Sequence, residues 1–138
     1  MHEIIKRIVV SILTWEAKLL LSRKKPKVVA ITGSVGKTAT KDAVYTVLKK
    51  HYFVRKSEKS FNSELGVPLT VLGLPNAWNS PLGWLHNCVS GFLIALFTRN
   101  YPEILVLEAG VDKPGDMQKL TAWMKPDYVV VTRLPSVP

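Results

Sequence analysis

An apolar run that leads through a glycine-bearing loop straight into a helix is the feature that most constrains the fold. Residues 27–32 (KVVAIT) are short, apolar and rich in β-branched side chains, which predicts a central parallel strand buried on both faces. The loop GSVG occupies residues 33–36, and residues 37–50 predict a helix. A strand, a tight turn and a helix in immediate succession indicate an α/β unit.

Further strands and a helix continue this alternation. Residues 52–55 (YFVR), 103–110 (EILVLEAG) and 127–132 (DYVVVT) each predict a strand, and residues 116–124 (DMQKLTAWM) predict the helix between the last two. Crossovers between parallel strands are right-handed and place helices on the faces of the sheet. We therefore predict a doubly wound, mostly parallel α/β sheet with helices on both faces and a ligand site at the carboxyl ends of its strands.

Two apolar segments stand apart from this pattern. Residues 3–22 predict an amphipathic helix, with apolar side chains at three- or four-residue spacing at Ile5, Ile8, Val9, Ile12, Trp15 and Leu19. Residues 81–97 are the most apolar segment, but they are interrupted by polar residues and fall short of the roughly 20 residues that a membrane span needs. Each helix could pack on the domain or lie on a membrane surface, and residues 81–97 could also form a re-entrant membrane segment. We divide the chain into an N-terminal helix, residues 1–25, and one domain, residues 26–138.

The charge balance indicates an anionic partner. The chain holds 19 Lys and Arg against 10 Asp and Glu, a formal charge of +9. The basic clusters lack the interleaved aromatic residues of a base-stacking surface, which argues against nucleic acid. A single cysteine, Cys88, excludes an intramolecular disulfide, and we found no convincing signal peptide. We therefore expect a cytoplasmic protein, with peripheral contact at the inner face of the membrane left open.

The loop after the first strand has the residue types of a phosphate site. Gly33 and Gly36 let the backbone turn tightly, so that N–H groups and a helix N-terminus can face an anion. Lys37 offers a full positive charge to the β- and γ-phosphates of ATP, and Thr38 offers a hydroxyl oxygen to Mg²⁺. The general pattern is incomplete because Ile31 stands where a further glycine is expected. The candidate cofactor-binding residues are Gly33, Ser34, Val35, Gly36, Lys37, Thr38 and Ala39.

Four blocks of sequence resemble one known family. The shortened loop G-x-x-G-K-T after an apolar strand is similar to that of the Mur ligase superfamily. Within it, the segments that resemble the branch adding D-alanyl-D-alanine are residues 33–42 (GSVGKTATKD), 60–72 (SFNSELGVPLTVL), 105–117 (LVLEAGVDKPGDM) and 125–132 (KPDYVVVT). The resemblance implies an ATP-dependent amide ligase that acts on a UDP-muramoyl tripeptide through an acyl phosphate.

The resemblance also implies roles for single residues. Lys37 and Glu108 would be catalytic, Thr38 and Glu108 would hold magnesium, and Asn62 would face the nucleotide and muramoyl substrates. From the residues alone, Glu108 can also be a strand-end surface glutamate, and Asn62 can simply cap a turn before a helix.

Departures from the family pattern lead to a further expectation. The sequence offers a single helix in place of the family's domain for the UDP sugar, and it stops before the family's histidine metal ligand, carbamylated lysine and C-terminal domain. We therefore expect a C-terminally truncated ligase that needs the missing C-terminal domain as a partner for turnover. Two alternatives are a folylpolyglutamate- or cyanophycin-type ligase and a non-enzymatic, membrane-associated nucleotide-binding module.

Overall fold

The computed structural model describes residues 2–58, 63–110 and 114–134. The strands are β1 (Lys27–Thr32), β2 (Val54–Lys56), β3 (Ile104–Glu108) and β4 (Tyr128–Val131). The helices are α1 (Glu3–Lys24), α2 (Lys37–Leu48), α3 (Ser63–Leu72), α4 (Pro81–Phe97) and α5 (Asp116–Thr121).

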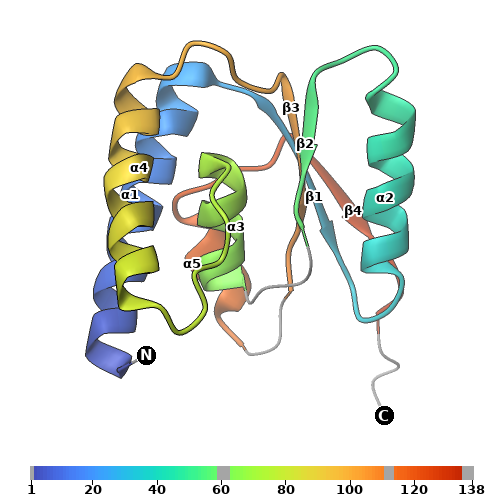
Figure 1. Ribbon diagram of the computed structural model, residues 1–138. Helices are drawn as coiled ribbons and strands as arrows, with labels where there is room; N and C mark the ends of the chain where they lie inside the picture. Colours follow the sequence, from blue (N-terminus) through green and yellow to red (C-terminus); the bar gives the residue numbers. More distant parts are fainter. Residues whose placement is uncertain (1, 59–62, 111–113, 135–138) are drawn as a thin grey trace.

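The four strands form one parallel sheet in the order β2-β3-β1-β4 (Figure 1). Strand β1 lies inside the sheet, between β3 and β4, and its pairing with β3 sets Ile31 opposite Glu108. Because all strands run the same way, their carboxyl ends meet at one edge, where β1 turns into α2. The predicted parallel α/β fold is confirmed.

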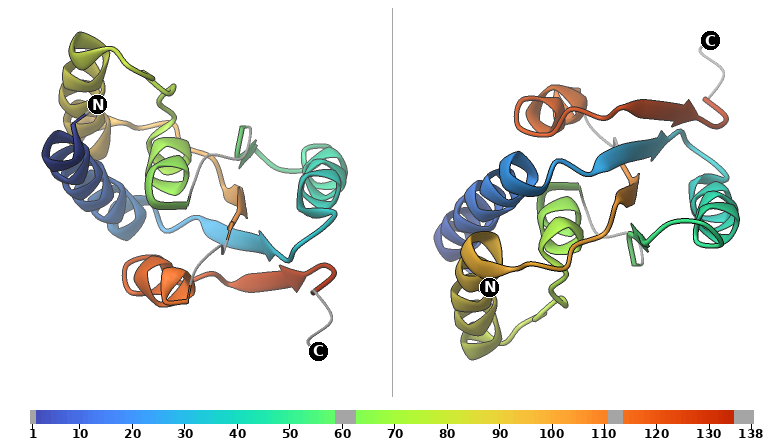
Figure 2. Two further views of the ribbon diagram at one scale, coloured as in Figure 1. Left: turned by 90° about the horizontal axis from the view of Figure 1, so that it is seen from below. Right: turned by 90° about the horizontal axis from the view of Figure 1, so that it is seen from above.

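Helices cover both faces of the sheet unequally. Helix α2 lies on one face, against β1, β2 and β3. Helix α3 packs against β3 on the other face, with α5 beside it, and α1 and α4 form an outer layer beyond α3 (Figure 2). The molecule is therefore thick on one side of the sheet and thin on the side that carries α2.

The core is divided by the sheet, as alternation along a strand requires. Val28 and Leu105 point toward the thick side and join the buried residues of α1, α3 and α4. Ile31 and Val106 point the other way, toward the apolar side of α2. Successive side chains of a strand face opposite sides, so both faces of β1 are buried, as its apolar sequence predicted.

Helix α3 enters the sequence analysis only as the helix that Asn62 could precede, without bounds, and its burial explains why its extent was not predicted. Every residue from 65 to 72 is buried. A helix that is enclosed on all sides shows no alternation of apolar and polar faces, and Pro68 in its middle is a further signal against a helix. A further difference concerns β2, which spans Val54–Lys56 rather than residues 52–55; Tyr52 and Phe53 lie before it and are exposed.

Helix α1 buries a different stripe from the one that its spacing indicated. Its buried residues are Val9, Leu13, Glu16, Ala17 and Leu20. Of the predicted stripe, Val9 is buried, but Ile5, Ile8, Ile12 and Trp15 are exposed. The helix is apolar over more than one face, and the domain covers only one of them. No helix within the described ranges is long and apolar enough to cross a membrane.

Candidate phosphate and magnesium site

The glycine-bearing loop leaves the carboxyl end of β1 in a conformation that only glycine fits. Gly33 has a φ of 135°. A Cβ atom at this position would lie 2.0 Å from Oγ1 of Thr132. The backbone of Thr132 is fixed, because its N–H donates to the Thr32 carbonyl at 2.8 Å. The close approach of β1 and β4 at this edge therefore requires the absence of a side chain.

The next residue is tied to the segment after β4. The Ser34 N–H and Oγ each donate to the Arg133 carbonyl at 2.7 Å, and Val35 forms an isolated antiparallel bridge with Arg133. In this conformation the Ser34 N–H does not point into an anion site. Ser34 instead fixes the loop, and the phosphate-facing donors lie in the residues that follow.

Helix α2 begins with open hydrogen-bond donors. Gly36, with a φ of 85°, is its N-cap and provides no side-chain cap. The first intrahelical bond runs from the Thr40 N–H to the Gly36 carbonyl, so the N–H groups of residues 37–39 have no partner within the helix. Lys37 is half-buried, and among the described residues it has no ion-pair partner. The positive end of the helix and this lysine together favour an anion.

Thr38 and Glu108 meet at the start of the helix. Thr38 Oγ1 lies 3.2 Å from Oε1 and 3.3 Å from Oε2 of Glu108. Glu108 is the last residue of β3 and is buried, so its carboxylate lies beside the loop, where its position at the end of a central strand predicted it. The two side chains offer adjacent oxygen atoms at the foot of the phosphate loop.

This donor set fits magnesium. Mg²⁺ binds through one or two carboxylates and completes its shell with water and phosphate oxygens, so a hydroxyl and one carboxylate beside a phosphate loop suffice. Within the part of the chain that the structure describes, no group of three or more His, Cys, Asp or Glu side chains forms a cage of protein ligands. A metal ion here would therefore depend on the phosphates for the rest of its ligands.

A buried lysine, which the sequence analysis missed, lies behind Glu108. Lys41 Nζ is 3.4 Å from Oε2 of Glu108 and donates to the Glu58 carbonyl at 2.9 Å. Its side chain is 4% exposed, and that of Glu108 is 5% exposed, so the charges compensate each other away from water. The sequence indicates only that positions 38 and 41, three apart, share one side of a helix; the burial of Lys41 comes from the packing of α2 against β3.

Backbone and hydroxyl groups complete the fixation of Glu108. Its N–H donates to Ser57 Oγ at 3.0 Å, and the Ser57 N–H donates to the Val106 carbonyl at 2.9 Å. A second ion pair, Lys56 with Asp42 at 2.9 Å, joins β2 to α2. The hydrogen bond from Lys56 lowers the pKa of the Asp42 carboxyl, so this pair is charged at neutral pH.

The structure thus brings most of the predicted site residues together. Residues 33–39, which include Ala39 in the first turn of α2, lie at the same edge of the sheet as Glu108. Asn62 lies outside the described residues. The residues that sequence reasoning did not identify are Lys41 and Ser57, both of which act on Glu108.

Comparison with known proteins identifies the family. Residues 31–80 match the Mur ligase middle domain. The chain is 33% identical over 118 residues to the UDP-N-acetylmuramoyl-tripeptide–D-alanyl-D-alanine ligase of Bacillus subtilis, covering 86% of this chain and 21% of that protein. The ligase of the same name from Borreliella burgdorferi is 30% identical over 126 residues, covering 91% of this chain and 22% of that protein.

A solved structure shows the same fold. The MurF ligase of Thermotoga maritima, crystallised in complex with ADP, superimposes with a TM-score of 0.65 at 30% identity, covering 93% of this chain and 24% of that one. The chain spans about a fifth of the length of the curated relatives that it matches. The match to the family model includes the phosphate loop, residues 33–36, and the start of α2. This chain therefore carries a Mur ligase middle domain.

Proposed function

We propose that the chain binds MgATP at residues 33–39 and provides the phosphoryl-transfer part of an ATP-dependent amide ligase. The observation that supports this best is the contact between Thr38 and Glu108 at the open N-terminus of α2. It sets two oxygen ligands for a hard cation beside the donors that suit phosphate. The solved relative in complex with ADP, superimposable over most of this chain, supports the same assignment.

Each residue has a distinct task in this proposal. Lys37 stabilises the charge that develops on the transferring phosphoryl group, and the N–H groups of residues 37–39 orient the phosphates. Thr38 and Glu108 hold magnesium, and Glu108 acts as a metal ligand rather than as a base. Bound ATP supplies the γ-phosphoryl group that activates a peptide carboxylate as an acyl phosphate, from which an amine displaces phosphate.

The substrates are assigned by similarity. We propose a UDP-muramoyl tripeptide as the carboxylate substrate and D-alanyl-D-alanine as the amine, as the names of the relatives state for those proteins. Asn62 is proposed to face these substrates. Residues 26–138 would act as the middle domain, and a further, C-terminal ligase domain would hold the amine. The folylpolyglutamate- or cyanophycin-type alternative has no observation in its favour.

Binding and turnover can be tested separately. Calorimetry of ATP with magnesium, and again with a chelator, tests the nucleotide site, and Lys37→Met is the matched variant because it keeps the length of the side chain. Metal-dependent binding that Lys37→Met abolishes is the expected result, and equal affinity of the two proteins would refute the assignment.

Phosphate release is then measured with both proposed substrates, for this chain and for a version joined to the C-terminal domain of a relative. Phosphate release by the joined protein but not by this chain alone would support the proposal that a C-terminal domain holds the amine.

We further propose a cytoplasmic location for this activity, with peripheral contact at the inner face of the membrane. The apolar outer layer formed by α1 and α4 supports that contact.

A further inference from the structure

Helices α1 and α4 turn an apolar surface to the solvent. They pack side by side as the outer layer of the thick side of the molecule (Figures 1 and 2). Exposed fractions reach 64% for Ile4, 54% for Ile8 and 55% for Trp15 on α1. On α4 they reach 78% for Leu82, 61% for Leu85 and 70% for Phe97. We call this surface, the exposed apolar side chains of both helices, the α1–α4 face.

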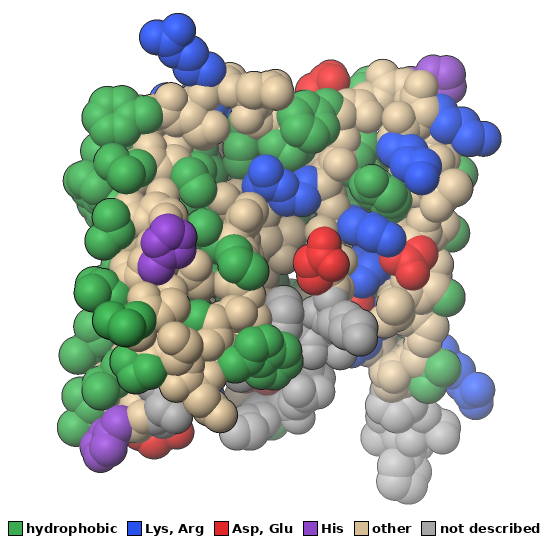
Figure 3. Space-filling view, viewed as in Figure 1, with side chains coloured by type: hydrophobic (Ala, Val, Ile, Leu, Met, Phe, Trp, Pro, Cys, Tyr) green, Lys and Arg blue, Asp and Glu red, His purple; other side chains and the backbone are tan. Residues whose placement is uncertain are grey.

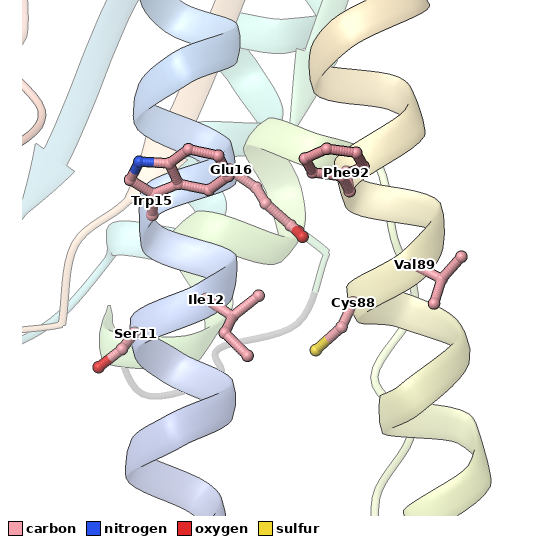
Figure 4. A pocket seen from close by; sticks show the side chains of 7 residues that line it. All are labelled: Ser11, Ile12, Trp15, Glu16, Cys88, Val89 and Phe92. Carbon is pink, nitrogen blue, oxygen red and sulfur yellow. The ribbon is translucent and has the colours of Figure 1, made fainter.

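The α1–α4 face is continuous across the two helices. Figure 3 shows apolar side chains gathered along the edge of the molecule where α1 and α4 lie. Between the helices, Ile12 and Trp15 of α1 and Val89 and Phe92 of α4 line a groove of about 510 Å³ (Figure 4). The rings of Trp15 and Phe92 stack across it with centroids 6.4 Å apart. Contiguous apolar surface of this kind is a docking site in soluble proteins rather than a random feature.

Positively charged side chains lie at both ends of the α1–α4 face. Residues 2–26 and 80–100 carry seven Lys and Arg but only two acidic residues, and one of these, Glu16, is buried. At one end, the Arg23 guanidinium donates to the Ala95 carbonyl, and Lys24 Nζ donates to the Arg99 carbonyl at 2.9 Å. These contacts place the side chains of Arg23 and Lys24 beside the end of α4. Lys6 and Arg7 lie near the opposite end of the face, in the first turns of α1.

The apolar surface and the positive charge together favour one kind of partner over the others. A second copy of the chain would bring one cationic border against another, which costs free energy. A bilayer with anionic headgroups instead complements both features at once, because apolar side chains enter the interface while lysine and arginine stay among the headgroups. The helices would lie on the membrane, since none of the described helices is long and apolar enough to cross it.

We propose that the α1–α4 face docks this protein on an anionic lipid surface, with both helices lying along the interface. This proposal is independent of nucleotide binding. It leaves the site accessible, because α2 lies on the other side of the sheet from α1 and α4 (Figure 2) and the phosphate loop lies at the carboxyl edge of the sheet. Substrates that move in water would still reach the carboxyl edge of the sheet while the protein is docked.

Vesicle sedimentation tests the proposal. The full chain is mixed with phosphatidylcholine vesicles that contain or lack phosphatidylglycerol, at low and at high salt. We expect binding to the anionic vesicles that weakens with salt, and at least a roughly tenfold loss of partitioning in the double variant Ile8→Glu/Leu93→Glu, which charges one exposed position on each helix. Val47→Glu is the matched control, because Val47 is 64% exposed on α2, on the opposite face of the sheet, and should leave vesicle binding unchanged.

Three outcomes would overturn the proposal. The first is equal, weak sedimentation with both kinds of vesicle, and the second is equal binding by the wild type and the double variant when circular dichroism shows both to be folded. The third is a wild-type dimer that the double variant converts to monomers, with no vesicle binding, which would assign the face to self-association. ATP binding measured on the same samples separates these outcomes from a failure of the nucleotide site.

Discussion

Lys41 Nζ lies 3.4 Å from Oε2 of Glu108, and both side chains are buried at the point where α2 crosses the end of β3. The lysine reaches the carboxylate from behind, while Thr38 contacts it from the side of the phosphate loop. One carboxylate thus serves two purposes: it is the proposed metal ligand, and it neutralises a buried cation. We regard Lys41 as a positioning residue, because it is buried and contacts Glu108 Oε2 and the Glu58 carbonyl.

The first prediction concerns this pair and stability. Lys41→Met leaves the Glu108 charge buried without compensation, so the free energy of unfolding should fall by about 3 kcal/mol. Adding Glu108→Gln should recover much of that loss, because neither side chain is then charged. Urea unfolding followed by circular dichroism measures both values. Lys37→Met is the control and should leave stability nearly unchanged, because Lys37 is only half-buried and lacks an ion-pair partner among the described residues. Additive losses in the double variant would show that the pair is not coupled.

The second prediction concerns metal affinity. Glu108→Gln should lower stability, because it leaves the buried Lys41 charge without compensation. At a temperature where circular dichroism shows the variant to be folded, it should also weaken magnesium in a titration of nucleotide binding, by about tenfold or more, because a neutral amide is a poorer ligand for a hard cation than a carboxylate. Lys41→Arg should stay close to the wild type, since it preserves the positive charge behind Glu108. The readout is the magnesium concentration at half-maximal ATP binding. An unchanged midpoint in Glu108→Gln would make Glu108 a purely structural residue.

The third prediction separates the two glycines of the loop. A Cβ at Gly33 would collide with Thr132 Oγ1, whereas a Cβ at Gly36 would meet no atom of the described residues within 4 Å. Both positions have positive φ, so both alanine variants are strained, by about 1–3 kcal/mol from φ alone. Gly33→Ala should therefore lose clearly more thermal stability than Gly36→Ala, and Thr132→Ala should restore part of the Gly33→Ala loss. Equal melting temperatures for the two single variants would contradict the geometry.

Much of this site could be predicted from the sequence, because it depends on local patterns. The order strand, glycine loop, Lys-Thr and helix sets the positions of Gly33, Lys37 and Thr38, and the apolar run before Glu108 sets that residue at the same edge of the sheet. Lys41 could not be identified as a site residue from such local patterns. A lysine in a helix is ordinarily solvated, and only the packing of α2 against β3 shows that this one is buried.

The fold was less predictable where amphipathic patterns fail. Helix α3 is enclosed on all sides and therefore shows no periodic signal, and it also contains Pro68. Helix α1 has apolar residues on more than one face, so its spacing could not reveal which of them faces the core. The structure shows that Leu13 and Leu20 face inward and that Ile8 and Trp15 face the solvent. The same ambiguity left a membrane contact undecided in the sequence.

The last prediction concerns Glu16, an acid buried between α1 and α4. Its Oε2 has no hydrogen-bond partner among the described residues and lies against Gly91, where a Cβ would meet it at 2.1 Å. Burial raises the pKa of the Glu16 carboxyl from 4.5 to about 7. The titratable group that faces it from α4 is Cys88, and burial together with the Glu16 charge raises the pKa of that thiol, so it stays neutral in this range.

The folded state binds the Glu16 proton more tightly than the unfolded chain does, so protonation favours folding. This contribution is fully present below the unfolded pKa of 4.5 and is lost as the pH rises through about 7. Glu16→Gln has a neutral side chain at every pH. Its melting temperature should therefore match that of the wild type near about pH 5 and exceed it near about pH 8. Thermal unfolding across this range measures the difference between the two proteins. A difference that does not change with pH would mean that Glu16 keeps its charge in the folded protein, and the assignment of the raised pKa to burial between α1 and α4 would then be wrong.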